Sequence, residues 1–224
     1  MAEAAARSER VRLAVYVAVG LVLALVLLST VHHFLFQTYV VPSASMEPLL
    51  DVGDRVAVNK LAEPQRGDVV VFDDPGGWIA QAQDEAEHPV AGALSDVGIL
   101  PPDTGDNLVK RVVGVPGDHV ACCTSDDHLT VNGRPVVETG YLEKGARETH
   151  TFFEVTVPKR SLFVMGDNRG ESTDSRHHLA AGGHTFVPFD HVVGTVAAVV
   201  WPAGDVHGVG HTSVFLREAG KPKN

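Results

Sequence analysis

The sequence is poor in basic residues and in cysteine. Lysine and arginine together number 18 against 28 acidic residues, which gives a formal net charge of -10. This balance excludes nucleic acid as an expected partner, because phosphate binding needs concentrated positive charge. The only two cysteines, Cys122 and Cys123, are adjacent. Neighbouring cysteines rarely reach good disulfide geometry, so we expect two free thiols, with a strained bridge as the alternative, and two thiols alone do not make a metal site.

Long helical patterns are missing after residue 35. Short runs rich in β-branched residues, bounded by turn residues, occur instead at 54–58, 68–72, 108–115, 151–157, 161–166 and 192–201. Asn132-Gly133 stands between alternating apolar residues and predicts a β-hairpin over 129–137. The 224 residues suffice for one sizeable core. We therefore predict a mostly β fold, in which a coiled or barrel-like antiparallel β domain follows one N-terminal transmembrane helix.

The one long apolar run stands near the N-terminus. Leu13 to Val31 are 19 residues without charge, and a helix of this length covers about 28 Å, close to the hydrocarbon thickness of a bilayer. A cleaved signal peptide is the alternative, but its apolar region is shorter, about 7 to 15 residues. Three arginines precede the run, so the N-terminus is expected in the cytoplasm. We expect a single-pass protein of the cell membrane, in contact with lipid.

These features divide the chain into four parts. Residues 1–12 are the cytoplasmic N-terminus, 13–33 the transmembrane anchor, 34–216 an extracytoplasmic β domain and 217–224 a flexible tail. Within the β domain, residues 73–106 hold eight acids and neither Lys nor Arg. We interpret them as an acidic surface insertion. A metal site is the alternative, but the acids are scattered and lack ligand spacing.

Candidate nucleophiles follow the anchor in "VPSASMEPLL", residues 41–50. A serine attacks only when a base removes its proton. A Ser-His-Asp hydrolase is one hypothesis, although no G-x-S-x-G elbow is present to hold such a serine. Its candidate bases are His177, His178, His184 and His191. A non-catalytic, membrane-tethered β module is a further hypothesis.

Lys110 offers a different base, because it stands inside a strand otherwise made of Leu and Val. If Arg111 points to water, alternation turns Lys110 toward the core. The reverse orientation, or a rim strand with both side chains exposed, fits the pattern equally well. A lysine buried among apolar groups has a lowered pKa, and neutrality near pH 7 requires a drop of roughly 3 units. Neutral lysine accepts a proton from serine in known Ser-Lys pairs.

A third group of residues lies in the turn-rich segment "MGDNRGESTDSR", residues 165–176. Asp174 and Arg176 are placed to form an ion pair that fixes this loop, and Ser172 is placed to hydrogen-bond a neutral lysine. The alternative is a plain surface turn with exposed charges.

Together these stretches resemble bacterial type I signal peptidase, the leader peptidase of protein export. The resemblance covers nearly the whole chain and rests on the anchor and on motifs in the family's order: "PSASMEPLL", "VGD", "RGDVVVF", "KRVVGVPGD" and "GDNRGESTDSR". It implies a membrane-anchored serine endopeptidase with a mostly β catalytic core and no metal or cofactor. Its substrates would be the signal peptides of exported preproteins, cut after small residues of the A-x-A type. We expect a monomer.

The resemblance also assigns roles by position. Ser45 matches the nucleophile and Lys110 the general base, while the Ser43 hydroxyl and the Ser45 amide match the oxyanion hole. Ser172 matches the serine that orients the lysine, and Asp174 and Arg176 match the supporting ion pair. The shallow substrate pockets are implied at Val41, Pro42, Met46, Leu50 and Val109. Leu108 and the lengthened segment 177–185 depart from the family's pattern.

Overall fold

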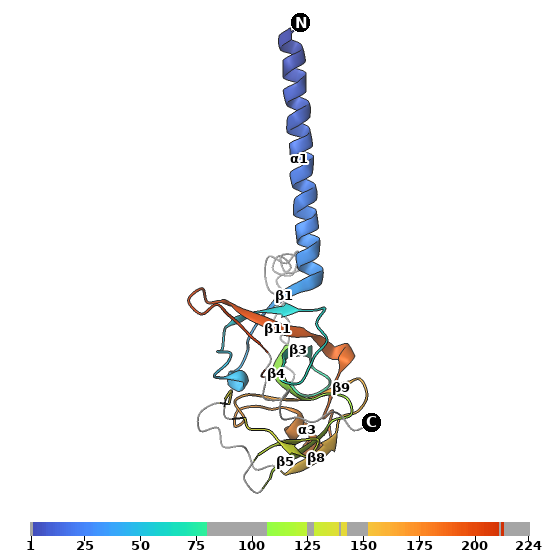
Figure 1. Cartoon of the computed structure of the whole chain (residues 1–224), viewed down its shortest axis with the longest axis vertical. Helices are drawn as coiled ribbons and strands as arrows, with labels where there is room; N and C mark the ends of the chain where they lie inside the picture. Colours follow the sequence, from blue (N-terminus) through green and yellow to red (C-terminus); the bar gives the residue numbers. More distant parts are fainter. Residues whose placement is uncertain are drawn as a thin grey trace.

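The computed structural model describes residues 2–79, 107–124, 128–138, 140–142, 152–210 and 212. A long helix, α1 (Ala2–Leu35), projects from one end of a β body that holds the other described elements (Figure 1). The mostly β fold is confirmed. Among the described residues, however, no helix is long and apolar enough to cross a membrane, and the transmembrane helix expected over 13–33 is not confirmed.

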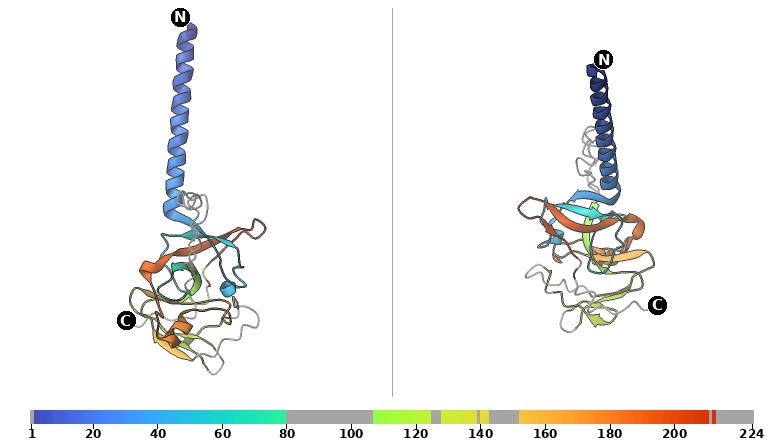
Figure 2. Two further views of the ribbon diagram at one scale, coloured as in Figure 1. Left: turned by 180° about the vertical axis from the view of Figure 1, so that it is seen from behind. Right: turned by 45° about the horizontal axis from the view of Figure 1, so that its top comes forward.

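The larger sheet has eight strands in the described part of the chain, in the order β1–β2–β11–β3–β4–β9–β10, with β12 paired to β11. All of its pairings are antiparallel. Its strands are β1 (Phe36–Val40), β2 (Arg55–Asn59), β3 (Val69–Asp73), β4 (Asn107–Gly114), β9 (Ser161–Met165), β10 (Val187–Pro188), β11 (Val192–Trp201) and β12 (His207–Gly208). Strands β1 and β11 lie at the end of the body nearest α1 (Figures 1 and 2).

The smaller sheet has four antiparallel strands in the order β7–β6–β5–β8. They are β5 (His119–Cys122), β6 (Thr130–Val131), β7 (Arg134–Pro135) and β8 (Phe153–Thr156). Asn132 and Gly133 join β6 to β7 with φ angles of 56° and 77°, as a two-residue turn of this type requires. The hairpin expected over 129–137 is thus confirmed. The described short helices are η1 (Ala44–Met46), α3 (Ser175–Ala181) and η2 (Phe189–His191).

Strands β3 and β4 are buried on both faces. Val69, Val71 and Val109 belong to one core cluster, which we call the first core, together with residues of β1, β2 and β11. Val70 and Val112 belong to another, the second core, together with residues of β9 and β10. A strand between two cores needs apolar residues at every position, which explains the unbroken apolar run of β3. It also means that neither face of β4 is open to water.

The segment expected to be an acidic surface insertion, 73–106, is described only as far as residue 79. This first part is not a plain excursion. The carboxylate of Asp74 accepts hydrogen bonds from the backbone amides of Gly76, Gly77, Trp78 and Ile79. Trp78 is buried, with its ring 5.5 Å from that of Phe72. Residues 80–106, and the tail expected at 217–224, lie outside the described residues.

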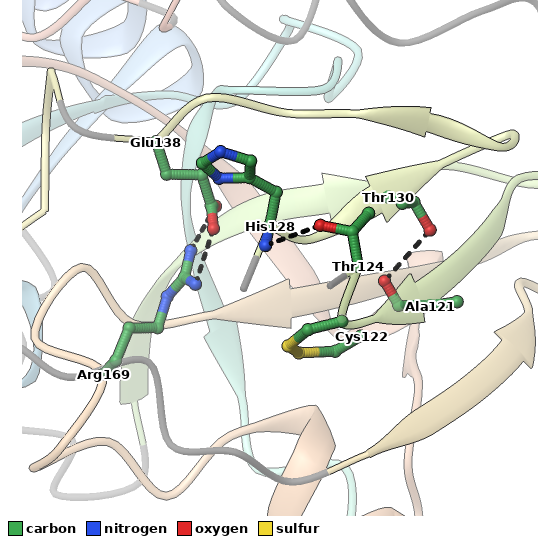
Figure 3. Close-up of a disulfide and its surroundings, with 8 residues drawn as sticks. Ala121, Cys122, Thr124, His128, Thr130, Glu138 and Arg169 are labelled. Atoms are coloured by element: carbon green, nitrogen blue, oxygen red, sulfur yellow. Dashed lines mark hydrogen bonds and ion pairs between the residues drawn. A yellow bond between two sulfur atoms is a disulfide. The ribbon is translucent and has the colours of Figure 1, made fainter. Parts of the chain in front are cut away.

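Cys122 and Cys123 form a disulfide at the end of β5 (Figure 3). The expectation of two free thiols is therefore wrong. It rested on the usual geometry of neighbouring residues, and the alternative, a bridge between the two, is what the structure contains. Figure 3 shows the disulfide in the same region as the ion pair between Glu138 and Arg169.

Candidate active site

Ser45 lies in η1, a single 3-10 turn that follows β1. Two backbone hydrogen bonds hold the chain just before this turn: the Val41 amide donates to the Asp54 carbonyl at 2.8 Å, and the Gly53 amide donates to the Val41 carbonyl at 3.0 Å. The turn itself has no side-chain cap at Ser43. Because such short turns have little intrinsic stability, the position of Ser45 depends on its tertiary contacts.

The first of these contacts is with Lys110, in the middle of β4. Its Nζ donates a hydrogen bond to Ser45 Oγ at 2.6 Å and a second one to the Val109 carbonyl at 3.1 Å. Ser45 is 4% exposed and Lys110 is 2% exposed. The structure therefore brings together the two residues that the sequence assigned as nucleophile and base.

Burial lowers the pKa of Lys110 from 10.5 to about 8, while the negative charges of Asp174 and Asp167 act in the opposite direction. No carboxylate is hydrogen-bonded to this amine in the described part of the chain, and no ion pair offsets its burial. At pH 7, a group with a pKa about one unit higher is neutral in roughly a tenth of the molecules. A reactive neutral fraction is thus present at physiological pH.

Arg111 is also buried, so none of the three alternatives left open for this strand applies: neither residue points to water. Its guanidinium binds both carboxylate oxygens of Asp167, through Nε at 2.7 Å and Nη2 at 2.5 Å. Its Nη1 donates to the Gly67 carbonyl at 2.7 Å and to Thr212 Oγ1 at 2.8 Å. A buried charge is tolerated when it is paired and hydrogen-bonded. Arg111 has such partners, whereas no carboxylate of the described residues is hydrogen-bonded to Lys110, and its charged form is destabilised by burial.

The loop 166–176 is not the plain surface turn that was the alternative. Asp174 and Arg176 are both buried and form the expected ion pair, with 2.8 Å between Arg176 Nη2 and Asp174 Oδ2. Burial alone would raise the pKa of Asp174, but the hydrogen bonds and charge of Arg176, with the Gly166 amide and the Ser172 hydroxyl, lower it. Asp174 is thus a fixed anion in the interior.

Ser172 differs from the expectation that it hydrogen-bonds Lys110. Its hydroxyl donates to Asp174 Oδ2 at 2.8 Å, and none of the described contacts of Lys110 involves it. A serine hydroxyl has a single proton to donate, and the ionised carboxylate of Asp174, two residues away, is a stronger acceptor for it than a neutral amine.

The expected oxyanion groups lie side by side. The exposed Ser43 hydroxyl donates to Ser45 Oγ at 3.2 Å. The backbone amide of Ser45 donates to no acceptor among the described residues. This leaves it available for an incoming oxygen.

Sequence reasoning missed two residues of the "GDN" run that hold this turn. Asn168 donates to the carbonyls of Ala44 and Ser45. Gly166 lies so close to the turn that a Cβ there would meet Ser172 Oγ at 2.4 Å and the Ser45 carbonyl oxygen at 2.5 Å. The sequence contained a hint of their role, because both residues lie in the turn-rich segment 165–176 that was selected for Ser172, Asp174 and Arg176.

The residues implied as pocket walls divide into two groups. Pro42 is exposed. The other four lie in the first core, each less than 5% exposed: Val41, Met46, Leu50 and Val109. These four therefore offer little open surface of their own.

The histidines proposed for a Ser-His-Asp hydrolase are not bonded to Ser45, although His177 Nδ1 lies 4.0 Å from Asp174 Oδ1. The described hydrogen bonds of Ser45 reach Ser43, Lys110 and Asn168, and none reaches a histidine. The His178 ring stacks on Trp78 at 4.4 Å, and the His184 carbonyl accepts from Trp78 Nε1. In the part of the chain that the structure describes, no group of three or more His, Cys, Asp or Glu is arranged to hold a metal ion.

Comparison with known proteins identifies the family of this site. A sequence profile described as "Signal peptidase, peptidase S26" matches residues 13–201. The chain belongs to this family. The resemblance to bacterial type I signal peptidases that the motifs predicted is therefore confirmed, and the chain is a member of a peptidase family.

Sequence comparison with individual signal peptidases supports the same family assignment. The chain is 41% identical over 213 residues to "Signal peptidase I" of Mycobacterium tuberculosis, covering 83% of this chain and 71% of the relative. It is 34% identical over 199 residues to "Signal peptidase I T" of Bacillus subtilis, covering 84% and 85%. A crystal structure of a signal peptidase I from Enterococcus faecalis matches 60% of this chain and 97% of its own, at 24% identity and a TM-score of 0.38, too low to carry an argument.

Proposed function

We propose that this protein is a serine endopeptidase that removes signal peptides from exported preproteins, with Ser45 as nucleophile and Lys110 as general base. The observation that carries the proposal is the hydrogen bond of 2.6 Å between Lys110 Nζ and Ser45 Oγ. Both groups are buried, and the pKa of the amine is lowered to about 8. A serine hydroxyl beside a partly neutral amine is the arrangement that a Ser-Lys mechanism needs.

The reaction has two stages. Neutral Lys110 takes the proton of Ser45 while Ser45 Oγ attacks the scissile carbonyl carbon, and the carbonyl electron pair moves onto the oxygen. The Ser45 amide and the Ser43 hydroxyl stabilise that oxyanion, each such donor contributing roughly 3 kcal/mol in comparable enzymes. The protonated lysine then gives its proton to the leaving amine. An acyl-enzyme remains, and Lys110 removes a proton from water to release it.

The supporting residues Ser172, Asp174 and Arg176 act on Ser45 and Lys110 indirectly, through the loop in which they lie. Arg176 holds Asp174, which accepts from Ser172 and from the Gly166 amide. Their role is to fix the loop that lies against the Ser45 turn. Pro42 is the exposed member of the proposed substrate-binding set, with Val41, Met46, Leu50 and Val109 as its support. The family resemblance implies shallow pockets at these residues, and such pockets would accept the small side chains of A-x-A sequences.

We also propose the membrane arrangement expected from the sequence: residues 13–33 as anchor, the N-terminus in the cytoplasm, and residues 34–216 outside it. The support is the exposure of apolar side chains along the described part of α1, where Leu13 is 65% and Leu27 is 66% exposed. Exposed apolar surface of this extent is costly in water and is covered by lipid or protein. Substrates whose signal peptides are themselves apolar would meet the active site near the bilayer.

One experiment tests the proposed activity. Purified protein is incubated with a preprotein that carries an A-x-A site, and the new N-terminus is sequenced. Cleavage directly after the second small residue is expected from the wild type and not from Ser45→Ala. Equal cleavage by the two proteins would refute the assignment of Ser45.

A further inference from the structure

Asn168 makes two hydrogen bonds to the Ser45 turn. Its side-chain Nδ2 donates to the Ala44 carbonyl at 3.2 Å, and its backbone amide donates to the Ser45 carbonyl at 3.0 Å. Two successive carbonyls of a single 3-10 turn are thus bound by one residue of a distant loop. The Ala44 carbonyl also accepts from the Glu47 amide at 3.2 Å, the only bond to this oxygen from within its own segment.

The bond to Ala44 has a particular consequence for Ser45. The carbonyl of Ala44 and the amide N–H of Ser45 belong to the same peptide unit. This unit is trans, because the cis bonds of the described chain lie elsewhere. In a planar trans peptide the C=O and the N–H point in opposite directions. By holding the Ala44 oxygen, Asn168 therefore directs the Ser45 N–H away from the loop 166–176.

The loop itself is anchored on both sides of Asn168. The preceding residue, Asp167, is held by Arg111, and the following residue, Arg169, binds Glu138 with 2.9 Å between Nη1 and Oε2. All four of these side chains are buried. Asn168 thus extends from a rigid support, and the direction that it gives to the Ala44–Ser45 peptide is well defined.

We propose that Asn168 is a positioning residue for the oxyanion hole, and that its side-chain amide orients and polarises the Ser45 N–H through the Ala44 carbonyl. This inference rests on the proposed function, since the N–H acts only when Ser45 attacks a carbonyl. A hydrogen bond accepted by the carbonyl of a peptide strengthens the donor at its other end. The gain appears in the transition state, where charge develops on the substrate oxygen, and is small in the ground state.

Two substitutions separate this role from packing. Asn168→Asp keeps the size of the side chain but replaces the donor with an acceptor that repels the Ala44 oxygen. Asn168→Ala removes the donor and leaves the backbone bond to Ser45. Glu171→Ala is the matched control, because Glu171 lies in the same loop and is exposed. Melting temperatures and active-site titration identify the folded fraction of each protein.

The readouts are steady-state kinetics on an A-x-A peptide and inhibition by a peptide aldehyde that ends in alanine. The aldehyde is informative because Ser45 Oγ adds to its carbonyl carbon and places an oxygen anion or hydroxyl at the Ser45 N–H, as in the transition state. We expect both Asn168 variants to lower kcat by about 10- to 100-fold, less than the roughly 100- to 1,000-fold loss on removing a donor itself. Aldehyde affinity should fall in parallel, while KM stays within about twofold.

The pH profile completes the test. The profile of kcat for Asn168→Ala should keep the wild-type apparent pKa, because Lys110 is not touched. Wild-type kcat and aldehyde affinity in both variants would overturn the inference, as would a loss confined to KM or fully accounted for by unfolding. If the wild type itself shows no Ser45-dependent cleavage, the proposed function fails first, and that result is distinct from the others. Should Asn168→Ala fail to fold, Asn168→Asp still decides.

Discussion

At the scale of single residues, the site contains two buried cations that are treated differently. Arg111 has a bidentate carboxylate partner, so its charge is compensated. Lys110 has a hydroxyl and a carbonyl as partners, and burial lowers its pKa to about 8. Arg111 thus keeps its charge, whereas the charged form of Lys110 is destabilised, although both residues stand on β4.

The first residue-scale prediction concerns the pH dependence of cleavage. Since only neutral Lys110 accepts the serine proton, kcat should rise with pH and level off above an apparent pKa of about 8. Lys110→Arg should be inactive across the range, because arginine does not lose its proton in proteins. Rates measured between pH 5 and 10 test both statements. A flat profile, or an active Lys110→Arg enzyme, would remove Lys110 from the mechanism.

The same pKa predicts a stability effect. Lys110 binds its proton less tightly when folded, with a pKa of about 8 against 10.5 in the unfolded chain. Below pH 8 both states are protonated, and burial of the charge costs about 3 kcal/mol. Between pH 8 and 10.5 the folded state alone is deprotonated, so this cost shrinks and then vanishes.

Lys110→Met should therefore raise the free energy of unfolding by about 3 kcal/mol at pH 6, with the gain disappearing by about pH 10.5. Denaturant unfolding at both pH values measures it. Lys60→Met is the control, because Lys60 is exposed on the surface and should show no such trend. A stability difference between Lys110→Met and wild type that stays the same at pH 6 and at pH 10.5 would contradict the lowered pKa.

The sequence predicted the pairing of Ser45 with Lys110, here called the dyad, better than it predicted the contacts around this pair. Alternation along β4 could not place Lys110, because both faces of this strand are buried and the polar-out half of the pattern is absent. The family motifs supplied the assignment instead. The partner of Ser172 was missed because a hydrogen bond between nearby residues depends on the course of the loop, which the composition of a turn does not specify.

At the scale of elements, the loop 166–176 is pressed against the turn that carries Ser45. Gly166 provides the close approach, since any side chain there would meet both Ser172 and the Ser45 carbonyl. The missing Cβ, rather than an unusual φ angle, is what this position requires. The close approach of the two elements therefore requires a glycine at position 166.

Gly166→Ala should force these elements apart. Overpacking of a tight contact costs about 1 to 3 kcal/mol, and the displaced turn should lose most of its activity. Gly170→Ala is a matched control in the same loop, because a Cβ at Gly170 meets nothing within 4 Å. Thermal unfolding and peptide cleavage compare the two. If Gly166→Ala and Gly170→Ala have the same melting temperature and the same cleavage rate, the close approach at Gly166 matters neither for stability nor for activity.

Elements with strong local signals were predictable, and those that depend on capping were overlooked. The 129–137 hairpin and the strand runs follow from turn residues and β-branched composition. Helix α3 was missed because it has only seven residues, too few for a period to be seen. Its ends were nevertheless marked, by Asp174 at the N-cap and by Gly182, with φ of 70°, at the C-cap.

At the scale of the whole molecule, α1 and the β body differ in whether their apolar side chains are buried. The body buries its apolar side chains in three clusters. The apolar side chains described on α1, the helix that projects from the body in Figure 2, are exposed instead. The contacts of the dyad all lie within the body, between residues 43 and 176. The chemistry and the proposed anchoring thus belong to separate parts of the chain.

Removal of residues 2–33 should therefore leave cleavage of a short soluble peptide largely intact, within about tenfold, and abolish binding to lipid vesicles. Flotation of the full-length and the truncated protein with phosphatidylcholine vesicles measures the binding. Ser45→Ala is the inactive control for the cleavage assay. A full-length protein that fails to float with vesicles would contradict the membrane proposal and leave the dyad untouched.

The order in which the chain is made has a bearing on when this enzyme can act. Lys110 follows Ser45 by 65 residues, and Asn168 follows Ala44 by 124. Synthesis runs from the N-terminus, so the nucleophile leaves the ribosome long before the loop that supports it. Under the proposed mechanism, a half-made copy would lack the loop that supports Ser45, and cleavage would begin only after this loop has been made and has packed against the turn.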